Sequence, residues 1–142
     1  MRDSYDYIIV GAGSSGCVLA NRLSADPDIS VLLVEAGPDD TSPLIRMPRG
    51  IGKLLAPGNP HVWDYPVRPA GNLPAETWLK GRAVGGSSSI NGMVYVRGAP
   101  ADYDHWAELG CVGWGWDTMG RHFVALEDHE LGAGEWRGAG GP

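Results

Sequence analysis

Two short apolar runs near the N-terminus have the pattern of buried parallel strands. Residues 5–10 and 30–34 are rich in β-branched and aliphatic side chains, and the chain between them has apolar positions that suit an amphipathic helix. We expect that helix to run from about Ser14 to Ser24, because Pro27 follows shortly afterwards. Strand, helix and strand in this order predict an α/β fold that begins with a Rossmann-like βαβ unit and a parallel sheet.

The first predicted strand passes directly into a glycine pattern made by Gly11, Gly13 and Gly16. In a dinucleotide-binding turn the first glycine permits the tight turn, the second lets the backbone approach a pyrophosphate, and the third lets helix and strand pack closely. Glu35 ends the second strand, 19 positions after Gly16. We expect this carboxylate to accept hydrogen bonds from a ribose diol and to disfavour a 2′-phosphate.

A second glycine-rich stretch spans residues 81–98. A glycine doublet at 85–86 precedes three serines at 87–89, a composition that suits a cradle of exposed amides but is also found in flexible linkers. The flanking apolar residues argue against a linker, since we expect them to form a buried aliphatic run: Ile90, Met93, Val94 and Val96.

The remaining segments give weaker signals. Seven prolines between residues 41 and 80 exclude long helices, so we expect an irregular loop there. Farther along, Trp106, Trp114 and Trp116 are spaced for an aromatic cluster around a glycine turn. The acidic residues near the C-terminus are expected to form a solvated face and no metal site: Glu127, Asp128, Glu130 and Glu135.

Composition limits the function classes. The chain has 142 residues and a net charge of −6, which disfavours nucleic acid as a partner. No apolar run approaches the roughly 20 residues of a transmembrane helix, and no signal-peptide pattern precedes the first strand, so we expect a cytoplasmic protein. Cys17 and Cys111 fit a reducing compartment, and neither is expected to be catalytic.

The two glycine motifs together resemble the glucose-methanol-choline (GMC) family of FAD-dependent oxidoreductases. Residues 81–91 match the family's pattern Gly-Arg-x-Val-Gly-Gly-Ser-Ser-x-Ile-Asn, and the later positions are Tyr95, Gly98 and Asp104. Resemblance extends to residues 35–37, 63–65, 102–106 and 113–114, and residues 94–98 are most similar to the choline-dehydrogenase-like and alcohol-oxidase-like branch. Cys111 and Val112 depart from the Asn-containing turn of many relatives, so the resemblance does not predict the conformation of that loop.

The resemblance implies a set of FAD-binding residues. Asn91 is expected beside the reactive ring, and because asparagine cannot form the covalent bond by which some relatives hold their flavin, noncovalent FAD is expected. The pyrophosphate would be held by the first glycine motif and the flavin by the second. The full set is Gly11, Gly13, Ser14, Ser15, Gly16, Glu35, Ala36, Arg82, Val84, Gly86, Ser87, Ser88, Asn91, Gly92, Met93 and Val94.

By the same resemblance, residues 1–142 form the N-terminal part of an FAD-binding domain. It divides into a dinucleotide unit (1–40), an irregular flavin-covering excursion (41–80), the flavin signature (81–104), and a helix with the start of a loop (105–142) that leads to a substrate domain missing from this chain. The catalytic histidine pair, or His-Asn pair, is expected in the missing part. No catalytic residue is therefore expected here, and we expect the chain alone to be inactive.

The function implied is hydride transfer from the CH–OH group of a primary alcohol, choline-like, aliphatic or aromatic, to flavin N5. The partners implied are that alcohol, oxygen or another electron acceptor, and the remainder of the same enzyme; an oligomer is compatible with the sequence. Two alternatives stay open from the residues: a noncatalytic remnant that binds FAD at most, and an NAD-dependent Rossmann dehydrogenase. A second dinucleotide unit, as in a flavin monooxygenase, is absent from the sequence.

Overall fold

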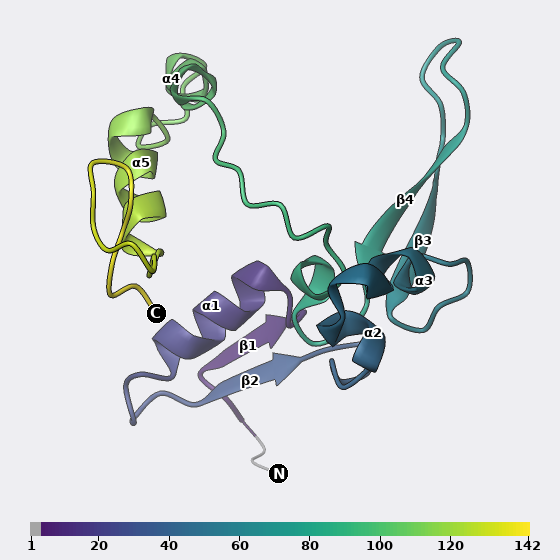
Figure 1. Ribbon diagram of the computed structural model, residues 1–142. Helices are drawn as coiled ribbons and strands as arrows, with labels where there is room; N and C mark the ends of the chain where they lie inside the picture. The colour runs from purple at the N-terminus through teal and green to yellow at the C-terminus, as the bar shows by residue number, and fades with distance from the viewer. Residues whose placement is uncertain (1–3) are drawn as a thin grey trace. The chain divides into compact units, whose positions relative to one another are not determined.

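The chain opens with a parallel βαβ unit (Figure 1). In the computed structural model, which describes residues 4–142, strand β1 (Tyr7–Val10) pairs in parallel with β2 (Val31–Val34), in a register that sets Tyr7 opposite Val31. Helix α1 (Ser14–Leu23) connects them and lies against both strands. The α/β class with a parallel start is therefore confirmed, and both strands begin one or two residues later than predicted.

Two glycines shape this unit. Gly11 has φ +99°, a conformation that favours glycine, at the turn that follows β1. A Cβ on Gly16 would overlap the carbonyl oxygen of Gly11 and approach Ile9 Cγ2 to 3.3 Å. Only a residue without a side chain lets the first turn of α1 lie this close to the end of β1.

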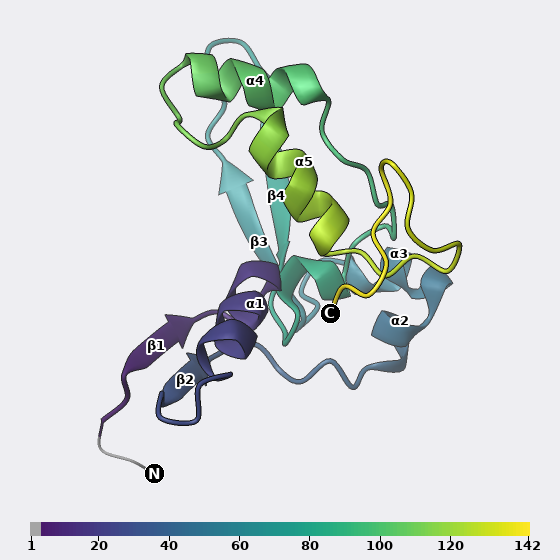
Figure 2. The ribbon, with the colours of Figure 1, turned by 90° about the vertical axis from the view of Figure 1, so that its left-hand side faces the viewer.

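The segment predicted as an irregular loop contains short helices and a hairpin. Helices α2 (Pro43–Arg46) and α3 (Ile51–Leu54) flank the 3₁₀ turn η1 (Pro48–Gly50). Strands β3 (Val62–Val67) and β4 (Glu76–Gly81) then pair antiparallel, side by side in Figure 2. The prediction is wrong for these strands.

The hairpin escaped prediction because Pro66 lies within β3, opposite Thr77. Proline removes a ladder N–H and argues against a central strand. In a two-stranded ribbon, however, one edge of each strand has no partner strand. A proline whose nitrogen lies on that edge removes no hydrogen bond from the ladder.

A small apolar core joins the hairpin to the short helices. Leu54, Val62 and Ile90 are buried together, with Leu44, Ile45, Leu55 and Leu79 packed around them. Ile90 follows the 3₁₀ turn η2 (Gly86–Ser89), which contacts β4 and α1. The signature therefore starts as packed structure, as its apolar flank predicts.

The rest of the predicted buried run is exposed. Met93, Val94 and Val96 are 59%, 80% and 78% exposed, so the expectation of a buried aliphatic run is wrong beyond Ile90. Residues 92–98 have no helix or strand, and the residues that the structure describes do not cover these side chains.

The chain folds as two compact units, the first ending at Val94 and the second formed by Tyr95–Pro142. The second unit contains α4 (Pro100–Glu108), α5 (Trp116–Ala125) and a closing loop that runs beside α5 (Figure 2). Asp104 Oδ1 accepts the backbone N–H of Trp116 at 2.9 Å and so joins the start of α5 to α4. No helix within residues 4–142 has the length and apolarity needed to cross a membrane.

The predicted aromatic cluster is present in this second unit. Tyr103 is buried, with ring centroids 5.2 Å from Trp106 and 5.6 Å from Trp116, and Trp106 contacts Trp114 at 6.1 Å. Glu127 departs from the predicted solvated acidic face. Its carboxylate is largely buried, pairs with Arg97 at 3.1 Å, and accepts the N–H of Gly138 at 2.9 Å, because the closing loop folds back over it.

Candidate functional site

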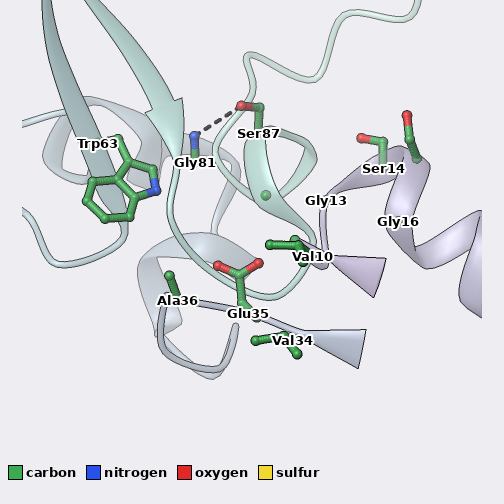
Figure 3. Close-up of a pocket in the computed structure, with 13 residues that line it drawn as sticks. Val10, Gly13, Ser14, Gly16, Val34, Glu35, Ala36, Trp63, Gly81 and Ser87 are labelled. Carbon is green, nitrogen blue, oxygen red and sulfur yellow. Dashed lines mark hydrogen bonds between the residues drawn. The ribbon is translucent and has the colours of Figure 1, made fainter. Parts of the chain in front are cut away.

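The carboxyl ends of β1 and β2 open into a cavity of about 580 Å³ within the first unit (Figure 3). This volume lies in the range of cofactor sites, roughly 300–1,000 Å³. Predicted and unpredicted residues line it together: Val10, Gly11, Gly13, Ser14, Ser15, Gly16, Val34, Glu35, Ala36, Trp63, Gly81, Gly86 and Ser87. The N-terminal glycine motif, the acidic strand end and the start of the signature therefore meet at one place.

The N-terminus of α1 supplies the positive side of the cavity. Gly13 is its N-cap, no side chain caps the helix, and its first turn holds no acidic residue. The first backbone N–H groups of a helix have no intrahelical acceptor, and the aligned peptide dipoles make this end partly positive. Ser14 and Ser15 add hydroxyls on the same wall. The arrangement suits an anionic group such as a phosphate.

Glu35 supplies the acceptor side. Its carboxylate stands between Val10 and Ala36 in Figure 3 and is half-buried. Oε2 accepts the N–H of Ala12 at 2.8 Å, and Oε1 accepts the N–H of Gly37 at 2.8 Å. A carboxylate has about four lone-pair positions, so two protein donors leave acceptor capacity for ligand hydroxyls. The charge is thus fixed in place by the backbone on both sides.

The signature docks on the first glycine motif through backbone. Gly85 N–H donates to the carbonyl of Ala12 at 2.7 Å, and a Cβ on Gly86, whose φ is +56°, would come within 2.8 Å of Gly13 Cα. Ser14 Oγ donates to Ser88 Oγ at 3.2 Å. Two sequence motifs separated by about 70 residues are therefore in direct glycine-to-glycine contact.

The same docking brings Ser87 to the cavity. Its hydroxyl oxygen accepts the N–H of Gly81 at 3.0 Å, the dashed contact in Figure 3. The end of β4 and the start of η2 are thereby held together at the cavity wall.

Several predicted FAD residues lie outside this cavity. The exposed group from Asn91 to Val94 does not reach it, and Arg82, Val84 and Ser88 do not line it. Asn91 Oδ1 accepts the N–H of Met93 at 2.7 Å, and its Nδ2 donates to the carbonyl of Ser88 at 3.0 Å. Asn91 and Met93 border a separate hollow of about 50 Å³ beside α2 and α3. The predicted set is therefore split into two places.

Four lining residues were absent from the predicted set. Val10 and Val34 end the parallel strands, and the rule that ligands bind beyond the carboxyl ends of such strands would have found them. Gly81 ends β4. Trp63 lies in the segment 63–65 that resembles the family, but its position beside the cavity depends on a hairpin that the prolines concealed.

Comparison with known proteins gives a family model and curated relatives. Residues 5–140 match the family model GMC oxidoreductase. The chain is 52% identical over 128 residues to an alcohol dehydrogenase [acceptor] of Pseudomonas putida, covering 89% of this chain and 23% of that protein. It is 44% identical over 144 residues to the oxygen-dependent choline dehydrogenase of Photobacterium profundum, covering 100% and 25%. The chain thus spans about a quarter of the length of these curated relatives.

Solved structures with the same fold include two oxidases. Pyridoxine 4-oxidase from Mesorbium loti superposes with a TM-score of 0.87 at 42% identity, covering 97% of this chain and 27% of that one. A formate oxidase variant from Aspergillus oryzae, studied for modification of its FAD, gives 0.82 at 32% identity, covering 100% and 26%.

Proposed function

Because the chain belongs to the GMC oxidoreductase family, whose members bind FAD and act on alcohols, we propose that it supplies the FAD-holding part of an enzyme that oxidises a primary alcohol. The substrate class proposed is a choline-like, aliphatic or aromatic alcohol, and the electron acceptor is oxygen or another oxidant. The observation that carries the proposal is that the uncapped N-terminus of α1 and Glu35 line the same cavity.

The residues of the cavity fit the ADP half of FAD. The amides at the start of α1 and the hydroxyl of Ser15 are donors for a pyrophosphate, and the Ser14 hydroxyl joins them by turning away from Ser88. Glu35 is an acceptor for ribose hydroxyls. Gly13 presents backbone without a side chain: a Cβ there would have as its nearest neighbour only Gly86 Cα, at 4.0 Å. The donors at the start of α1 and the acceptor Glu35 therefore lie apart in one cavity, as the pyrophosphate and the ribose of a dinucleotide require.

The flavin half is assigned to Val84, Asn91, Gly92, Met93 and Val94, with Ser88 as a neighbour. Arg82, which the resemblance counts among the FAD residues, lies over the Trp63 ring and is not assigned to the flavin. In the described residues Asn91 braces its own turn by hydrogen bonds to both sides, which fixes the side chain that is proposed to lie beside the ring. We propose noncovalent attachment, since the asparagine side chain forms no bond to flavin carbon.

Bound FAD would supply the hydride acceptor for the alcohol carbon. The chain's own contribution is binding and orientation: α1 neutralises phosphate charge, Glu35 fixes the sugar, and η2 holds the two glycine motifs together. The base that takes the hydroxyl proton is assigned to the histidine pair expected outside this chain. None of the four histidines in residues 4–142 lines the cavity.

The test is an absorption spectrum of the full-length product of the gene, followed by anaerobic titration with a panel of primary alcohols. We expect flavin absorbance, bleaching by at least one alcohol, and release of the flavin on acid denaturation. A protein without flavin that oxidises alcohols with a nicotinamide cofactor would overturn the proposal. Flavin that no alcohol reduces would favour the noncatalytic remnant, and flavin that stays with the denatured protein would refute noncovalent attachment.

A further inference from the structure

Trp63 places a large aromatic surface at the cavity. The residue lies on β3 opposite Lys80 in the hairpin register and is 39% exposed. It lines the same cavity as Glu35 and Ala36, on the side away from Ser14 (Figure 3). An aromatic wall is therefore present beside the carboxylate that is assigned to the ribose.

The polar edge of this indole has no protein partner. Within residues 4–142 no acceptor is within hydrogen-bond distance of Trp63 Nε1, and Figure 3 shows the nitrogen on the side of the ring that faces Glu35. Trp78 on β4 differs, because its Nε1 donates to Glu76 Oε1 at 3.0 Å. A tryptophan with an apolar face and an unused donor is suited to a ligand that is itself aromatic and polar.

Arg82 holds the indole from one side. Its guanidinium carbon lies 4.6 Å from the centroid of the Trp63 ring, the geometry of a cation–π contact. Among residues 4–142 no carboxylate pairs with Arg82, and its buried Nε has no hydrogen-bond partner. A buried N–H without an acceptor lowers the stability of the fold. Arg82 has such an N–H at Nε, while its guanidinium lies over the Trp63 ring. The contact with Arg82 therefore fixes the position of the Trp63 ring at the cavity.

We propose that Trp63 packs against the adenine of the bound dinucleotide and that Arg82 positions the indole for this contact. The inference rests on the proposed function and deepens it by adding a contact for the adenine. With the pyrophosphate at α1 and the ribose at Glu35, the next group outward is the base, and Trp63 is the aromatic side chain that borders the cavity beyond Glu35. Stacking on an aromatic side chain is a common way for proteins to hold a base.

The first test uses the full-length product of the gene with its flavin removed, and ADP as the probe. We expect Trp63→Ala to weaken ADP and FAD binding by about tenfold, while Trp63→Phe keeps most of the affinity because a ring remains. FMN, which has no adenine, should bind both variants like the wild type. Trp78→Ala is the matched control: it removes an exposed tryptophan from the same hairpin that does not line the cavity.

A second readout separates contact from a structural role of the hairpin. Adenine stacked on an indole changes the fluorescence of that indole, so ADP should alter tryptophan emission in the wild type and in Trp78→Phe, but much less in Trp63→Phe. Arg82→Met should weaken ADP binding by a smaller factor in the wild type, and by nothing further in Trp63→Ala. That coupling distinguishes a positioning residue from an independent ligand contact.

The outcomes are distinguishable from failure of the proposed function. If the wild-type protein binds neither FAD nor ADP, the function itself is wrong. If it binds both, and Trp63→Ala binds ADP with unchanged affinity, the inference about Trp63 is overturned while the function stands. Equal weakening of FMN and ADP by Trp63→Ala would also overturn it, because the effect would then come from a general disturbance of the site.

Discussion

Glu35, which directly follows β2, accepts the backbone N–H of Ala12, in the turn after β1, over 2.8 Å. Ala12 is almost fully buried, at 1% exposure, so this N–H has no access to water as an alternative acceptor. A carboxylate that sequence spacing assigns to a ribose is thus also a brace for the turn that receives the phosphate. Ligand binding and the shape of the loop depend on the same side chain.

Glu35→Ala is therefore expected to lower both FAD affinity and stability. Loss of the acceptor leaves the Ala12 N–H unsatisfied, a cost of about 1–3 kcal/mol, and removes the ribose contact. We expect about tenfold weaker FAD retention and a free energy of unfolding lower by about 2 kcal/mol in the flavin-free protein. Urea unfolding with and without FAD measures both terms. Asp39→Ala removes an exposed carboxylate nearby and should change neither; an unchanged flavin-free stability in Glu35→Ala would contradict the brace.

A second prediction concerns the contact between the two glycine motifs. A Cβ on Gly86 would lie 2.8 Å from Gly13 Cα at a positive φ of 56°, so even Gly86→Ala should separate the loops. The added side chain would meet the backbone of the first glycine motif. We expect Gly86→Ala to destabilise the protein by about 2 kcal/mol and to weaken FAD binding, as measured by thermal unfolding and flavin titration.

Gly92→Ala is the matched control for Gly86, because a Cβ at Gly92 meets nothing within 4 Å. The control should unfold like the wild type. Equal stability of Gly86→Ala and Gly92→Ala would show that the two motifs do not press against each other through Gly86 and Gly13.

A third prediction lies in the second unit. Arg97 pairs with Glu127 at 3.1 Å, with side-chain exposures of 16% and 18%, and also donates to the carbonyl of Trp136 at 2.8 Å. Arg97→Met keeps much of the apolar stem but strands the Glu127 charge, so we expect a loss of about 2–3 kcal/mol in urea unfolding. His105→Ala, which breaks the exposed contact to Glu108, should cost less than about 0.5 kcal/mol. Similar costs for both variants would refute a structural role for the Arg97 pair.

Local patterns predicted the βαβ unit because each of its parts has a local cause. Hydrophobic runs mark the strands, Gly11 marks a positive φ, and Gly16 marks a contact with no room for a side chain. The hairpin was missed because a proline is tolerated only at a strand edge, and the sequence does not state which strands are edges. Trp63 was missed for the same reason, since its place at the cavity is set by pairing with residue 80.

The flavin-side residues illustrate a different limit. Met93 and Val94 have the composition of a buried run, yet they are exposed in the described chain. Apolar composition predicts that a side chain will be covered, but it does not say by which residues. Burial of Ile90 follows from neighbours that this chain contains, namely Leu54 and Val62.

The last prediction concerns Asn91 as the support of an unusual backbone. Met93 has φ +59°, a conformation that costs a non-glycine residue about 1–2 kcal/mol, and its N–H is held by Asn91 Oδ1 at 2.7 Å. Asn91→Ala should release this turn and weaken flavin binding about tenfold. Met93→Gly in the same protein removes the strain and should recover part of the loss, whereas Met93→Leu should recover none. Flavin titration of the three variants measures this, and recovery by leucine equal to that by glycine would show that the backbone conformation is irrelevant to the effect.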